Sequence, residues 1–184
     1  MPTLAGKGIV LRAHTEADVA RIVEQSRDPM SQRFIPLPFP YEESDARGYL
    51  EHVARSGWER GNLREFAIDE ILPDSTRRFV GNVALGSRDN GRYELGFVLH
   101  PDARGHGVIT RAADRLLTYA FDELDAQVIL WRALTGNKGS RRVAQKLGFS
   151  ICAQPLRKWG VFKGELVDEW QGTLVRHDHR PIIT

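Results

Sequence analysis

Residues 99–121 read LHPDARGHGVITRAADRLLTYAF, and this stretch decides the fold. From Val108 onward the apolar side chains recur every three or four positions, which predicts a helix with one face packed on a sheet. We expect this helix to run from about Gly105 to Phe121. Two glycines in its first turn would cost about 2 kcal/mol of helix stability. That cost indicates that the exposed backbone at the helix start binds a ligand.

The start of this helix has the properties of a phosphate site. The first N–H groups of a helix have no partner inside the helix and carry the positive end of its dipole. Glycine lets a phosphate approach that backbone, and Arg104 adds a fixed positive charge. The Walker pattern of nucleoside triphosphatases is absent, and Thr110 stands where a dinucleotide-binding pattern would need its third glycine. Both of those site types are therefore disfavoured.

The segments on either side of this helix predict a mixed sheet. Three successive strands joined by short turns indicate an antiparallel meander. A strand, the helix above and a further strand then form a parallel crossover. The fold class is therefore α/β, or α+β, with a mostly antiparallel central sheet and helices on both faces. The expected strands cover 8–14, 64–72, 77–88, 91–101, 126–134, 149–159 and 165–177, and the expected helices cover 15–28, 41–60, 105–121 and 138–147.

Composition limits the classes of function. A chain of 184 residues with 41% hydrophobic and 27% charged residues fits one globular domain, residues 1–184. No apolar run approaches the roughly 18 residues that span a bilayer, and the first residues lack the apolar core of a signal peptide. Cys152 has no partner for an internal disulfide, and we expect it to be a small core residue. These features predict a cytoplasmic protein without a membrane partner.

Charge and histidine spacing add two further expectations. A net charge of +2 is too small to indicate nucleic-acid binding, although acidic small ligands remain compatible with it. His177 and His179 have no third ligand at a suitable spacing, so we expect surface residues and no metal site.

Two blocks of sequence resemble one enzyme superfamily. The run from Arg104 to Ile109 resembles the R-x-x-G-x-G/A pyrophosphate-binding motif of the GNAT N-acetyltransferases, with Ile109 where the family has a small residue. The run NKGSRRVAQKLGF, 137–149, resembles the Asn-x-x-Ser-x-Arg helix of the ribosomal-protein N-terminal acetyltransferase branch (RimJ/RimL-like). The opening LRAHTEADVARI and the closing DEWQGTLVRHD are also similar to this branch. The resemblance implies the GNAT fold and acetyl-coenzyme A as co-substrate.

The resemblance also implies which residues hold the coenzyme. In this family the pantetheine arm lies between two splayed parallel strands, here the strands expected at 91–101 and 126–134. Asn137 would contact the arm, and it also reads as an ordinary N-cap of the helix that follows. The implied cofactor-binding residues are Phe97, Val98, Leu99, Arg104, Gly105, His106, Gly107, Val108, Ile109 and Asn137.

Acetyl transfer to an amine needs a neutral amine and a thiolate that can leave. A free α-amino group has a pKa of about 7.7–8.0, against about 10.4 for lysine, so an α-amine asks little of a general base. Glu94 precedes the coenzyme strand segment and matches a carboxylate common in this branch, so it is the candidate base, acting directly or through water. The alternative is an exposed strand residue paired with an arginine. Ser140 is the candidate hydrogen-bond donor to the leaving sulfur, and its alternative is an ordinary hydroxyl in a first helical turn.

The acceptor is less well defined by the sequence. The branch implies the N-terminal α-amine of a protein, attacked directly in a ternary complex. A small amine such as a polyamine, amino acid or aminoglycoside is an alternative, and an acyl-coenzyme A sensor without turnover is another. The proline-rich loop is either a packed connection between helices or one wall of the substrate pocket. In the second case the expected substrate contacts are Phe34, Pro38 and Phe39. A homodimer is compatible with the sequence, but no feature requires one.

Overall fold

The computed structural model describes residues 1–178 and 180–183. The strands are β1 (Leu4–Gly6), β2 (Ile9–Arg12), β3 (Leu63–Ile71), β4 (Arg77–Arg88), β5 (Arg92–Leu99), β6 (Val128–Leu134), β7 (Ser150–Ile151), β8 (Leu156–Phe162) and β9 (Glu165–Val175). The helices are η1 (Glu16–Asp18), α1 (Val19–Arg27), α2 (Pro29–Phe34), α3 (Glu43–Gly48), η2 (Tyr49–Arg55), α4 (Ser56–Arg60), η3 (Pro101–Ala103), α5 (Val108–Glu123) and α6 (Lys138–Lys146).

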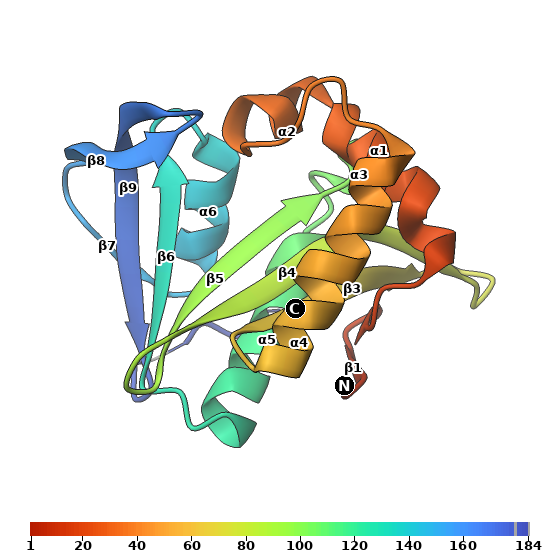
Figure 1. Ribbon diagram of the computed structural model, residues 1–184. Helices are drawn as coiled ribbons and strands as arrows, with labels where there is room; N and C mark the ends of the chain where they lie inside the picture. The colour runs from red at the N-terminus through yellow and green to blue at the C-terminus, as the bar shows by residue number, and fades with distance from the viewer. Residues whose placement is uncertain (179, 184) are drawn as a thin grey trace.

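The nine strands of the described residues belong to one sheet. Its order is β1-β2-β3-β4-β5-β6-β9-β7, and β8 pairs with β9. Among the described strands only β5 and β6 pair in parallel, and every other pair is antiparallel. Figure 1 shows the run α3–η2–α4 crossing in front of the sheet, with α5 on the far side. The predicted mixed, mostly antiparallel sheet with helices on both faces is confirmed.

Two apolar clusters attach these helices to the sheet. The larger cluster joins the buried face of α5 to the strands and contains the fully buried Trp131 and Phe66. The smaller one lies under α1 and α3 and includes Ile22, Ala46 and Phe79. Both faces of the central strands are therefore covered, which explains why β3 and β4 contain continuous runs of buried residues.

The strands β5 and β6 part along their length. Their pairing covers only Arg92–Leu95 against Val128–Trp131. Beyond these residues the two strands diverge, as the two arrows do in Figure 1. The divergence leaves the last four residues of β5 without a partner on that side. This gap is the splay that the resemblance implied.

The glycines of the opening stretch lie before α5 rather than inside it, which corrects the expected helix start at Gly105. The helix begins at Val108, with Gly107 as its N-cap. Gly105 has a φ of +88° and Gly107 a φ of +72°, in the left-handed region that side chains disfavour. The two glycines therefore do not lower the stability of the helix. Glycine is required instead by the loop that turns into the helix.

Other predicted elements also needed correction. The strand expected at 149–159 is divided into β7 and β8, and Cys152 lies exposed between them rather than in the core. The helix expected at 41–60 contains the π-helical η2 in its middle. Both β1 and α2 were not anticipated. In the described parts of the chain, no helix combines the length and the apolar character needed to cross a membrane.

Candidate active site

A cavity of about 340 Å³ lies at the open end of the gap between β5 and β6. Its walls come from α2, the end of β5, the glycine loop, the start of α5 and α6. The predicted residues that line it are Phe34, Phe97, Val98, Leu99, Arg104, Gly105, Gly107, Ile109, Asn137 and Ser140. Segments far apart in the sequence thus meet at one place. Other lining residues had no signal in the sequence: Met30 and Ser31 from α2, Ile35 directly after it, and Arg142, Val143 and Lys146 from α6.

The loop before α5 presents a row of free backbone donors. Among the described residues, none of the N–H groups from Gly105 to Ile109 has a hydrogen-bond acceptor, and the first helical bonds run from Thr110 and Arg111 to Gly107 O. A Cβ placed at Gly105 would meet no atom within 4 Å. Unpaired donors at the positive end of a 16-residue helix form an anion site. The space in front of Gly105 is where the anion can approach.

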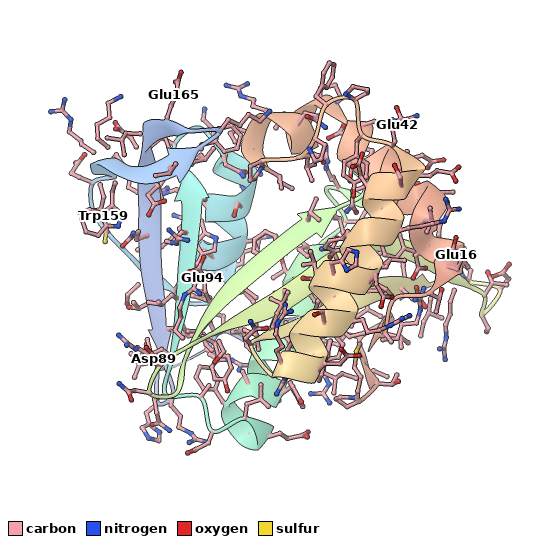
Figure 2. The ribbon with its side chains drawn as sticks, in the orientation of Figure 1. Glu16, Glu42, Asp89, Glu94, Trp159 and Glu165 are labelled. Atoms are coloured by element: carbon pink, nitrogen blue, oxygen red, sulfur yellow. The ribbon has the colours of Figure 1, made fainter. Side chains whose placement is uncertain are left out.

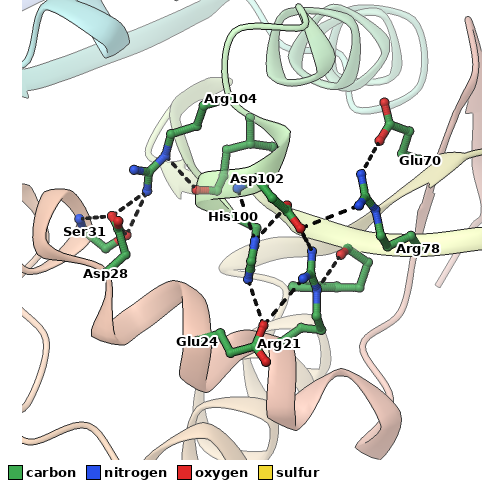
Figure 3. Close-up of polar contacts among 11 residues, drawn as sticks. Arg21, Glu24, Asp28, Ser31, Glu70, Arg78, His100, Asp102 and Arg104 are labelled. Atoms are coloured by element: carbon green, nitrogen blue, oxygen red, sulfur yellow. Dashed lines mark hydrogen bonds and ion pairs between the residues drawn. The ribbon is translucent and has the colours of Figure 1, made fainter.

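Arg104 is fixed by several contacts (Figure 3). Its Nε donates to Leu99 O (3.2 Å), and its Nη2 donates to Asp28 Oδ2 (2.7 Å) and Ser31 Oγ (3.3 Å). Burial alone would raise the pKa of Asp28, but the hydrogen bonds from Arg104 and Ser31 lower it below its usual value. Asp28 is therefore a carboxylate at neutral pH. Arg104 joins the glycine loop to α2 and to the end of β5, and its charge is balanced by Asp28.

The backbone of β5 offers hydrogen bonds to the gap at alternate residues. His100 N donates to Val80 O (2.8 Å), and hydrogen-bonded pairs alternate along an antiparallel ladder. The amide of Val98, two residues earlier, therefore points toward β4. The amides and carbonyls of Phe97 and Leu99 point toward the gap, where Leu99 O already accepts from the arginine described above. The predicted backbone contacts to a ligand arm can thus come from Phe97 and from Leu99 N–H.

The start of α6 prepares a hydroxyl donor at the same cavity. Asn137 is the N-cap, and its Oδ1 accepts from Ser140 N (3.1 Å). The indole N–H of Trp131 donates to Ser140 Oγ (3.0 Å). Because an indole N–H can only donate, the hydroxyl proton of Ser140 must point elsewhere, and no described residue accepts it. Ser140 is therefore held as a free donor.

Glu94 lies on the other face of the sheet and lines a second cavity. Figure 2 places it where β5 and β6 begin to part. Its Oε1 accepts from Arg132 Nε (3.1 Å) and Nη2 (3.0 Å), and its Oε2 accepts from Arg88 Nη2 (2.8 Å). A carboxylate has about four acceptor positions, so Oε2 retains one of them. Glu94 thus has the arginine pairing expected of an ordinary strand residue, and it also keeps a free acceptor position that a general base would need.

The other predicted residues lie outside the cavity lining. His106 is exposed, and Val108 is fully buried in the core, so only its N–H can reach the cavity. Pro38 is exposed, and Phe39 is 86% exposed. These two residues do not line the cavity that Phe34 lines, and their contact with a substrate stays a prediction. His179, considered above for metal binding, lies outside the described residues.

Comparison with known proteins gives the family. The model described as "Acetyltransferase (GNAT) domain" matches residues 9–150, so the chain belongs to the GNAT acetyltransferase family. "Putative ribosomal N-acetyltransferase YdaF" of Bacillus subtilis (strain 168) is 37% identical over 144 residues, 77% of each chain. An acetyltransferase (GNAT family) from Bacillus anthracis has a similar structure, with a TM-score of 0.82, 20% identity and coverage of 96% of this chain and 100% of that one.

A second solved structure contains a bound ligand. RimL, a ribosomal L7/L12 alpha-N-protein acetyltransferase in complex with coenzyme A, has a TM-score of 0.79 at 15% identity, over 95% of this chain and 98% of that one. At this identity the likeness establishes the fold alone. The family match and the relatives identify the chain as an acetyltransferase enzyme.

Proposed function

We propose that the protein transfers an acetyl group from acetyl-coenzyme A to the N-terminal α-amine of a protein, in a ternary complex. The observation that carries the proposal is the row of unpaired N–H groups from Gly105 to Ile109, which opens onto a cavity ending at Ser140. The printed names of YdaF and RimL support a ribosomal protein as acceptor. Use of acetyl-coenzyme A and the lone Cys152 favour the cytoplasm as the compartment.

The residues of the cavity fit the coenzyme. The free N–H groups of the glycine loop would hold the pyrophosphate, and the positively charged Arg142 and Lys146 would face its remaining phosphate. The amide groups of the pantetheine arm would pair with the free backbone of Phe97 and with the side-chain N–H2 group of Asn137. When bound, acetyl-coenzyme A supplies the thioester carbonyl that is attacked.

The two candidate catalytic residues act on the attacking amine and on the leaving sulfur. The acceptor nitrogen forms a bond to the carbonyl carbon, the carbon–sulfur bond breaks, and one proton leaves the nitrogen. The free position on Glu94 Oε2 accepts that proton, directly or through water, and returns it to solvent. Ser140 donates a hydrogen bond to the sulfur as negative charge develops on it. An α-amine needs little further help to become a nucleophile, since the pKa of its protonated form is only about 7.7–8.0.

A mass-spectrometric acceptor panel tests the proposal. The protein is incubated with acetyl-coenzyme A and with free-amine peptides, N-terminally blocked lysine peptides, polyamines and aminoglycosides. We expect the mass of one acetyl group to appear only on the unblocked peptides. Acetylation confined to small amines would replace the proposal with metabolite or antibiotic modification. Tight coenzyme binding without transfer to any acceptor would replace it with a sensor.

A further inference from the structure

The cavity that Glu94 lines has a volume of about 420 Å³ and a floor of small residues. It lies between the η2–α4 helix and the strands β3, β4 and β5. Its floor includes Ala84 and Gly96, which are register partners, and Gly86, which pairs with Glu94. A Cβ at Gly96 would meet no atom within 4 Å, so the glycine keeps this volume open. The space is wide enough for several atoms of a ligand beside the sheet.

The position of this cavity connects it to the gap. Gly96 is the first residue of β5 beyond the last one paired with β6, and it directly precedes Phe97. Successive residues of a strand face opposite sides of the sheet. Gly96 and Glu94 therefore face the η2–α4 side, while Phe97 packs with the core on the α5 side. A group in this cavity lies across the parting strands from the coenzyme cavity.

The rim of the cavity has an excess of positive charge. Its ionisable lining residues are His52, Arg60, Arg88 and Glu94. The carboxylate of Glu94 is already shared by Arg88 and, from β6, by Arg132. The guanidinium of Arg60 donates to Ser56 Oγ (2.6 Å) and has no carboxylate partner among the residues that the structure describes. An anionic ligand group would therefore find an available arginine here.

We propose that this cavity receives the acceptor and selects one with an acidic side chain close to its α-amine, recognised by Arg60. This inference rests on the proposed function and adds its substrate class. A charge-assisted hydrogen bond is stronger than one between neutral groups, and exposure to solvent at the open rim limits its effect. We therefore expect an Asp or Glu near the terminus to raise kcat/KM by about tenfold over Gln, which corresponds to about 1.4 kcal/mol.

The test compares peptides that differ only at the second and third residues, with Asp, Glu, Gln or Lys there. Purified wild-type protein, Arg60→Gln and Arg60→Glu are assayed for kcat/KM with each peptide. Arg55→Gln is the matched control, because Arg55 lies on the same helix, pairs with Glu51 and does not line the cavity. The expected result is loss of the acidic preference in Arg60→Gln and a preference for Lys in Arg60→Glu, with the wild-type ranking kept in Arg55→Gln.

The possible failures are distinguishable. Equal acetylation of all peptides by the wild type would overturn the acidic preference and leave the proposed function standing. A preference unchanged by both Arg60 substitutions would overturn the assignment of Arg60. Acetylation of small amines with no product on any peptide would overturn the proposed function and this inference with it.

Discussion

A buried histidine should make the protein sensitive to acid. His14 lies between the rings of Tyr49 and Phe79, at centroid distances of 5.6 and 6.0 Å. Its side chain is 3% exposed, and Asp18 Oδ2 lies 3.9 Å from its Nδ1. Neither ring nitrogen has a hydrogen-bond partner among the described residues. Burial lowers the pKa of His14 from 6.5 to about 4, against the opposing attraction of Asp18 and with a further lowering by Arg12.

The shift gives the sign and size of the effect. Because the pKa is lower in the folded state, the unfolded chain binds more protons between pH 6.5 and about 4. Stability is therefore lost as the pH falls through this window. A difference of one pKa unit corresponds to about 1.4 kcal/mol, so the folded state should lose about 3 kcal/mol from this group by pH 4.

The substitution His14→Phe keeps an aromatic ring between Tyr49 and Phe79 and removes the titration. Urea unfolding of both proteins at neutral pH and at pH 4 gives two stability differences, from which groups that titrate alike in both proteins cancel. The advantage of the variant should grow by about 3 kcal/mol on acidification. His14→Leu places a second non-titrating side chain at this position, so the test does not depend on how well Phe fits. A difference that stays constant with pH in both variants would refute the reasoning.

Three further predictions concern the active site. Gly107→Val (φ +72°) should reduce acetyl-coenzyme A affinity in calorimetry by more than about tenfold, while Gly164→Val (φ +85°), with similar backbone strain in a distant turn, should not. An equal loss would contradict the anion site. Ser140→Ala should lower kcat by about tenfold at unchanged coenzyme affinity, and Trp131→Phe should lower kcat by a smaller factor. A wild-type kcat in Ser140→Ala would show that the hydroxyl plays no part. Gly81→Ala puts a Cβ 2.4 Å from a β5 carbonyl oxygen, so both stability and coenzyme affinity should fall; wild-type affinity would contradict this.

The sheet could be predicted largely from the sequence because its strands alternate with short turns. The meander β3–β4–β5 and the crossover through α5 follow from chain order and handedness. The strand β1 was missed and β7 was joined to β8 in one expected strand, because three and two residues are too few to show a period. For α2 a signal did exist, since Asp28 is an N-cap followed by Pro29 at the first helical position. The π-helical turns of η2 have no comparable signal.

The site was predictable where one local segment supplies the chemistry. The glycine loop and the Asn137–Ser140 turn each contain the groups of the proposed site in a few adjacent residues. The contacts of Arg104 with Asp28 and of Glu94 with Arg132 were not predictable, because 76 and 38 residues separate the partners. Only the folded chain, which places the start of α2 beside the glycine loop and β6 beside β5, brings these charges together.

The pairing of Arg104 with Asp28 changes the interpretation of the sequence motif. An arginine whose charge is matched at 2.7 Å by a carboxylate contributes a much weaker net field to a neighbouring anion. Its bonds to Leu99 O and to α2 instead fix the glycine loop against the end of β5. In the proposed function, the attraction for phosphate would then come from the free N–H groups of the loop and the helix dipole. Because these contacts within the chain hold the loop in place, little free energy is spent on ordering its donors when a ligand binds. The glycines are needed because only they allow a backbone in this conformation to remain open to the anion.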